Sequence, residues 1–138
     1  MTIDTESFLA EMLPQQRTAE QAIHNGDAEP RIALWSRTDP VTVLGAKKSA
    51  SGWPDLEKLF HDVASWFSDA AEYEFEVIAA GASGDLAYTV GYERNQVKVD
   101  GQPRTYTLRA THVYRREDGQ WRIVHRHADV PPAEDASL

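Results

Sequence analysis

The sequence contains no cysteine, and this absence excludes several kinds of chemistry. Without thiols the chain can form no disulfide bond, no thiolate metal site and no cysteine nucleophile. It also has no apolar run that approaches the roughly 20 residues a membrane span requires. The amino terminus lacks the basic and apolar segments of a signal peptide. We therefore expect a cytoplasmic protein with no membrane partner.

Basic residues are scarce as well. Lysine and arginine number 14 and aspartate and glutamate number 22, so the net charge is −8. A surface this acidic is unsuited to a phosphate backbone, and we expect no nucleic-acid partner. The arginines nevertheless collect in residues 101–138, where a small anionic ligand can still be accommodated. The chain has no glycine-rich phosphate loop and no Gly-x-Ser-x-Gly elbow, and we expect no cofactor.

The first half of the chain has the apolar spacing of helices. One helix is predicted over about residues 8–23, where Pro14 should kink it or start a second helix. A short helix around residues 32–35 and a short strand over 41–44 should follow. The clearest helix is predicted over 54–70, because apolar side chains recur there every three or four residues.

The second half of the chain alternates apolar and polar residues, which predicts four strands. Asp100-Gly101 and Asp118-Gly119 lie between alternating runs and are strong hairpin signals. Helices followed by a meandering antiparallel sheet predict an α+β fold, with the helices on one face of a curved sheet. At 138 residues the chain has the length of one domain. We assign that domain to residues 1–130 and a flexible acidic tail to 131–138.

Two registers are open for the last hairpin. A two-residue turn at Asp118-Gly119 pairs His112 with His125 and places both, with His127, on the apolar face. A three-residue turn with a glycine bulge pairs Arg109 with His127 instead, because a slip of one residue exchanges the two faces. We prefer the first register, which separates apolar from polar side chains more cleanly. The histidines of the last strand share a face in both registers.

These imidazoles are the main candidates for chemistry, because imidazole titrates near neutral pH. The candidate catalytic residues are His125, His127 and His112. The alternative is that they are buried, hydrogen-bonded side chains that shape a pocket or an interface. No carboxylate completes a ligand set on their strand face, so we expect no metal site. The candidate pocket residues are four aromatic side chains and one arginine: Trp35, Trp53, Tyr88, Tyr92 and Arg109.

Several segments resemble the SnoaL-like domain of the nuclear transport factor 2-like superfamily. They are Leu34-Trp35-Ser36, residues 41–45, 84–87, 109–113 and 117–127. The last of them, Asp-Gly-x-Trp-x-x-Val-His-x-His, also resembles the association domain of calcium/calmodulin-dependent protein kinases. The resemblance covers about residues 8–129. It implies a cone, also known as a cystatin-like α+β roll, in which a strongly bent mixed or antiparallel sheet wraps around N-terminal helices.

The resemblance also implies a pocket at one end of the cone and a homodimer through the outer face of the sheet. It extends to ketosteroid isomerases, polyketide cyclases, epoxide hydrolases and dehydratases, so the fold leaves the activity open. Ketosteroid isomerases place an aspartate near the end of the first strand, where this chain has no acid in residues 43–46. Our first hypothesis is that the chain binds a small, largely apolar ligand, as an isomerase, cyclase or hydrolase using imidazole acid/base chemistry. The alternative is a non-catalytic homodimeric scaffold or accessory domain.

Overall fold

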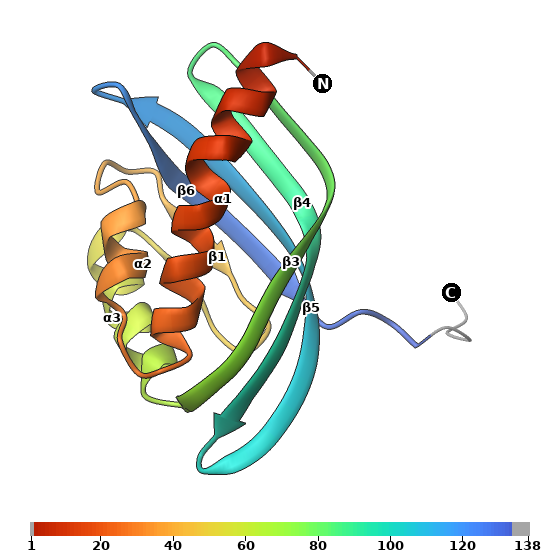
Figure 1. Cartoon of the computed structure of the whole chain (residues 1–138). Helices are drawn as coiled ribbons and strands as arrows, with labels where there is room; N and C mark the ends of the chain where they lie inside the picture. Colours follow the sequence, from red (N-terminus) through yellow and green to blue (C-terminus); the bar gives the residue numbers. More distant parts are fainter. Residues whose placement is uncertain (1, 134–138) are drawn as a thin grey trace.

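A single curved sheet with three helices on one side forms the protein (Figure 1). The computed structural model describes residues 2–133. Within the predicted tail, residues 131–133 carry no helix or strand, and residues 134–138 lie outside the described part. No helix of the described chain is both long and apolar enough to cross a membrane.

The first helix, α1 (Ile3–Ile23), begins where the Thr2 hydroxyl accepts a hydrogen bond from the Thr5 amide at 3.1 Å. Such an N-cap satisfies one of the amides that a helix start leaves unpaired. The helix is continuous through Pro14, so the prediction that a second helix starts there is wrong. Its buried side packs against the sheet, with Phe8 in edge-to-face contact with Tyr114 at 4.8 Å.

The two shorter helices are α2 (Glu29–Leu34) and α3 (Trp53–Ala64). The predicted helix over 54–70 extends too far at its carboxyl end. Trp66 and Phe67 continue the helical spacing, but Phe67 already pairs with Val99 in the sheet. Tertiary pairing therefore overrides the local apolar period in this segment.

Six strands form the sheet: β1 (Thr42–Leu44), β2 (Ser49–Ser51), β3 (Phe67–Ser83), β4 (Leu86–Val99), β5 (Gln102–Glu117) and β6 (Gln120–Asp129). Their order is β2-β1-β6-β5-β4-β3. Strands β1 and β6 run parallel and all other neighbours run antiparallel, so the sheet is mixed. The predicted α+β fold, with a bent sheet around N-terminal helices, is confirmed.

The hairpin between β5 and β6 has the predicted two-residue turn. Asp118 and Gly119 both have positive φ angles, 50° and 76°, as a tight hairpin turn requires. Tyr114 then lies opposite Ile123, which is the preferred register.

A β-bulge interrupts this register farther along β6. The next pair after the bulge joins Val113 to His125, so Val124 is an extra residue in β6. An extra residue reverses which side chains face inward beyond it. His112 consequently lies opposite Arg126. The predicted pairing of His112 with His125 is wrong, and both β6 histidines lie on the outer face.

The orientation of β4 also differs from the prediction. The buried positions of this strand are Ala87, Thr89, Gly91, Glu93, Asn95 and Val97. Tyr88 and Tyr92, which we expected on the inner side, therefore lie on the outer face of the sheet. The physical reason lies in β6, because the buried guanidinium of Arg126 pairs with Glu93 on the inner side.

Candidate functional site

A cavity of about 400 Å³ lies among the carboxyl end of α1, helices α2 and α3, and the inner face of the sheet. The loop between β1 and β2 and the hairpin between β4 and β5 contribute to its rim. Much of its wall is aliphatic or aromatic and includes Ile23, Val43, Leu59, Val63, Phe67 and Leu108. The cavity therefore offers mainly apolar surface to a ligand.

Two buried ion pairs form the polar part of the wall. Arg31 Nη2 lies 2.6 and 2.7 Å from the two carboxylate oxygens of Glu20. Arg126 Nη2 lies 2.7 Å from Glu93 Oε1, and Arg126 Nη1 lies 3.1 Å from Glu93 Oε2. All four side chains are buried and line the cavity. Their formal charges cancel.

The pairing controls the ionisation of Glu93. Burial alone would raise the pKa of this carboxyl, but the charge and hydrogen bonds of Arg126 outweigh burial and hold the pKa at about 2. Burial disfavours the Arg126 cation, yet Glu93 and Glu20 raise its pKa above the ordinary value. The Tyr73 hydroxyl donates to Glu93 at 2.9 Å and accepts from the Gln16 amide at 3.0 Å. The Glu93–Arg126 pair is thus held in its ionised form within a hydrogen-bonded surround.

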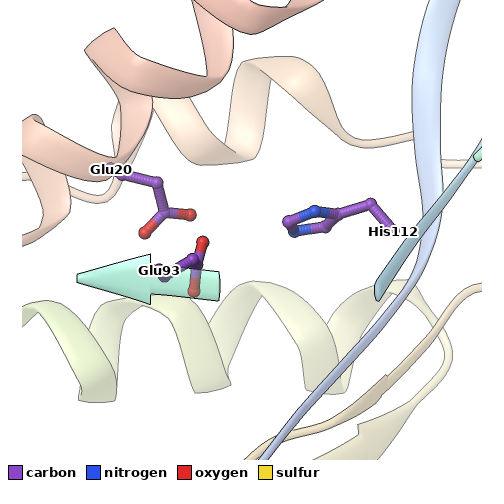
Figure 2. A group of neighbouring side chains, drawn as sticks. All are labelled: Glu20, Glu93 and His112. Carbon is purple, nitrogen blue, oxygen red and sulfur yellow. The ribbon is translucent and has the colours of Figure 1, made fainter. Parts of the chain in front are cut away.

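The side chains of Glu20, Glu93 and His112 converge from α1, β4 and β5 (Figure 2). One potential ligand atom from each lies within 4.8 Å of the others. Carboxylate and imidazole are common metal ligands. Here the two carboxylates are already neutralised by Arg31 and Arg126, and the group has no excess negative charge to attract a divalent cation. We therefore describe it as an ion network and assign no metal to it.

His112 belongs to this network. Arg126 Nη1 lies 3.0 Å from His112 Nε2, and a guanidinium can only donate. The imidazole therefore accepts at Nε2 and carries its proton on Nδ1. Burial and the Arg126 charge lower the pKa of His112 to about 3, so the ring is neutral at pH 7. His112 is not among the residues that line the cavity.

A second imidazole, that of His24, does line the cavity. Its Nδ1 lies 2.6 Å from the Glu20 carbonyl oxygen and its Nε2 lies 2.5 Å from the Tyr106 hydroxyl. Burial lowers the pKa of His24, although the nearby Glu20 carboxylate raises it. Burial also raises the pKa of Tyr106. Both groups are therefore uncharged at neutral pH.

The predicted aromatic pocket residues lie elsewhere. Trp35 is a core residue, 2% exposed, and its ring lies 5.2 Å from that of Phe60. Trp53 is half-buried against the same core at the start of α3. Tyr88 and Tyr92 lie on the outer face of the sheet. None of these four predicted side chains lines the main cavity.

The remaining predicted site residues also face outward. Arg109 forms two hydrogen bonds with Asp129, at 2.6 and 2.7 Å. His125 Nδ1 lies 2.7 Å from the Thr42 hydroxyl, and His127 is exposed. The expectation that these side chains line one pocket with His112 is wrong, because the bulge in β6 separates them onto opposite faces. A catalytic role for any of the three histidines stays a prediction.

Sequence reasoning missed the buried and half-buried polar residues that line the cavity: Glu20, His24, Arg31, Glu93, Tyr106 and Arg126. One signal was present, because Glu20 lies beside Ala19 and three residues before Ile23, within the apolar pattern of the helix. A charged residue within an apolar stripe indicates a buried partner. Arg126 could not be found in this way, because its inward orientation depends on the bulge.

The sequence matches the model of a known protein family. Residues 17–133 match the family model of the SnoaL-like domain. The chain belongs to this family. The predicted resemblance is therefore confirmed. A search of curated proteins finds no match to this chain.

Solved structures share the fold at low sequence identity. An NTF2-like protein of unknown function from Pseudomonas putida KT2440 is 21% identical, with a TM-score of 0.67 over 94% of this chain and 89% of that one. The association domain of C. elegans CaMKII is 14% identical, with a TM-score of 0.68 over 94% and 100%. An NTF2-like protein of unknown function from Shewanella oneidensis MR-1 is 16% identical, with a TM-score of 0.68 over 87% and 97%. These likenesses establish the fold.

Proposed function

We propose that this SnoaL-like protein binds a small, largely apolar ligand in the cavity between its helices and its sheet. The observation that carries the proposal is a cavity of about 400 Å³ with an apolar wall and two internally neutralised ion pairs. Small-molecule sites commonly have volumes of roughly 300–1,000 Å³ and mainly apolar linings. Burying apolar ligand surface there would be favourable by about 25 cal/mol per Å².

The charges at the rim favour an anionic group on the exposed end of the ligand. Lys47 and Lys48, between β1 and β2, and Arg104, on β5, line the cavity and are exposed. The carboxylates that line it, Glu20 and Glu93, each pair with a buried arginine. Lys48 Nζ lies 3.3 Å from Asp62 Oδ2, so Lys47 and Arg104 carry the positive charge that is left at the rim, although the whole chain is acidic. A medium-chain carboxylate has the required apolar body and anionic head.

The binding site can be tested with decanoate, measured by its displacement of a fluorescent anilinonaphthalene sulfonate. Leu108→Trp replaces an aliphatic side chain of the cavity wall with a larger indole and should weaken decanoate binding at least about tenfold. Leu86→Trp makes the same change on the outer face, where Leu86 is 58% exposed, and should leave the affinity unchanged. Equal decanoate affinities in the two variants would show that the ligand binds elsewhere.

The anionic head group can be tested separately. The double variant Lys47→Gln/Arg104→Gln should weaken the binding of decanoate several-fold and leave that of decanol unchanged, because only the carboxylate uses the rim cations. Lys58→Gln/Arg17→Gln removes the same charges outside the cavity and is the matched control. Equal losses in the two double variants would mean that overall charge, and not the rim, attracts the ligand.

We also propose a homodimer through the outer face of the sheet. Ile78 and Leu86 are each 58% exposed there, and Tyr88 is 44% exposed. Large apolar side chains gathered on one exposed face are typical of protein–protein contacts. Beside them a hollow of about 380 Å³ is lined by Tyr92, Arg109 and His127, among others. In the dimer these predicted site residues would be interface residues.

Light scattering at micromolar concentration tests the dimer. Ile78→Glu should convert the dimer to monomer, because it places a charge in an apolar interface. Ile3→Glu, at a residue 79% exposed on α1, should leave the dimer intact. A wild-type protein that is monomeric throughout this range would contradict the proposal.

A further inference from the structure

His24 and Tyr106 form a hydrogen-bonded pair in the cavity wall. The imidazole Nε2 lies 2.5 Å from the Tyr106 hydroxyl oxygen, and the Phe67 ring lies 4.6 Å from the imidazole. His24 is only 6% exposed. The pair joins the carboxyl end of α1 to β5, so two packed elements fix its geometry. The side-chain hydrogen bond between His24 and Tyr106 is separate from those of the two buried ion pairs.

The hydrogen bonds determine where each proton lies. The Glu20 carbonyl can only accept, so the proton of the His24 imidazole is on Nδ1, 2.6 Å from that oxygen. The charged groups facing His24 are Glu20 from α1, Arg31 from α2 and Glu93 from β4. Burial, aided by the Arg31 charge, outweighs the two carboxylates and lowers the pKa of His24, which keeps the ring neutral at pH 7. Nε2 is then an acceptor, and the hydroxyl of Tyr106 must donate to it.

With its proton committed to His24, the Tyr106 hydroxyl can offer only oxygen lone pairs to the cavity. We propose that the cavity selects a ligand that carries a neutral hydroxyl group on its apolar body, donated to the Tyr106 oxygen. A ligand ammonium would also donate, but the rim cations Lys47 and Arg104 disfavour a second positive charge in the cavity. The ligand class is therefore a hydroxylated, largely apolar carboxylate. This inference rests on the proposed function.

In this arrangement His24 is a positioning residue. It holds the phenolic proton away from the ligand, and so it makes Tyr106 an acceptor rather than a donor. Without the imidazole, the Tyr106 hydroxyl would be free to donate, and the cavity would then accept a carbonyl oxygen in place of a hydroxyl. His24 thus determines which of two oxygen groups is bound.

The experiment compares isomers of hydroxydecanoate with the matching oxodecanoates, with the oxygen moved along the chain. In each pair the oxygen is on the same carbon, but the hydroxy isomer can donate a hydrogen bond and the oxo isomer can only accept one. We expect at least one hydroxy isomer to bind the wild type about tenfold more tightly than its oxo partner, as one well-placed hydrogen bond would give. Tyr106→Phe/His24→Leu removes both acceptors and should abolish the preference. Tyr92→Phe, on the outer face, should retain it.

The single variant His24→Leu gives a result that loss of packing alone would not. It should raise the affinity of the oxo isomer relative to its hydroxy partner, because the Tyr106 proton is released. Amide spectra recorded by NMR would check that each variant is folded. If decanoate binds but no isomer is preferred, the hydroxyl inference alone is overturned. If decanoate itself does not bind, the proposed function fails and the inference falls with it.

Discussion

Strand β6 takes part in one arginine–carboxylate ion pair on each face of the sheet. On the inner face Arg126 and Glu93 are 8% and 2% exposed in their side chains, and their closest atoms are 2.7 Å apart. On the outer face Arg109 and Asp129 are 48% and 41% exposed, and their closest atoms are 2.6 Å apart. The geometries are alike and the access of water differs. Water can replace a lost partner on the outer face but not on the inner face.

The largest expected effect is the loss of one inner partner. Arg126→Met leaves the Glu93 carboxylate buried without its cation and should lower the free energy of unfolding by about 3–5 kcal/mol. Urea denaturation would measure this. Arg109→Met makes the same change on the outer face and should leave the urea midpoint almost unchanged. Similar midpoints in the two variants would mean that burial does not distinguish the pairs.

Between pH 7 and pH 5, acid should lower the free energy of unfolding by less than the Arg126→Met substitution does. His112 takes up a proton near pH 6.5 when unfolded and only near pH 3 when folded, so its contribution to stability is lost as the pH falls through this range. Glu93, with a folded pKa of about 2 against 4.5, adds a loss below about pH 4.5. Each group contributes a slope of up to about 1.4 kcal/mol per pH unit.

Urea titrations at pH 7, 6 and 5 would measure the slope. His112→Gln keeps an acceptor for Arg126 and should flatten the slope between pH 6.5 and 4.5. His127→Gln, on the outer face, should leave the slope as in the wild type. An unchanged slope in His112→Gln would contradict the burial of a neutral imidazole.

The smallest effect is expected when both inner charges are removed together. Glu93→Leu/Arg126→Met leaves no unpaired charge, and buried ion pairs replaced by apolar residues often cost little. The double variant should recover most of the stability lost in Arg126→Met, and remain within about 1–2 kcal/mol of the wild type. If it is as unstable as the single variant, the network around Tyr73 and Gln16 needs the Glu93 carboxylate itself.

Most of the fold could be predicted because the relevant signals are local. The apolar stripe of α1 and the Asp118-Gly119 turn each depend on a few neighbouring residues. The end of α3 could not be predicted, because Trp66 and Phe67 fit a helix as well as they fit the sheet edge that they join. The spacing of neighbouring residues does not reveal that Phe67 pairs with Val99, which is distant in the sequence.

The candidate site was harder to predict because it depends on one inserted residue. Ile123 and Val124 are both apolar, so the alternation of β6 gives no sign of which of them faces the core. The assignment of every later side chain to a face follows from that choice. The alternation therefore groups three histidines that the bulge divides, and it gives no sign that Arg126 faces inward.

The bulge at Val124 has a consequence for comparing relatives. The inward-facing residues have odd numbers before the bulge, such as Ile123, and even numbers after it, such as Arg126. A homologue with the same letters but no bulge would pair His112 with His125, and so turn its His-x-His motif toward the cavity and its intervening arginine toward solvent. Equivalence of cavity residues across the family therefore depends on whether the bulge is present, because aligned letters face opposite surfaces when it is absent.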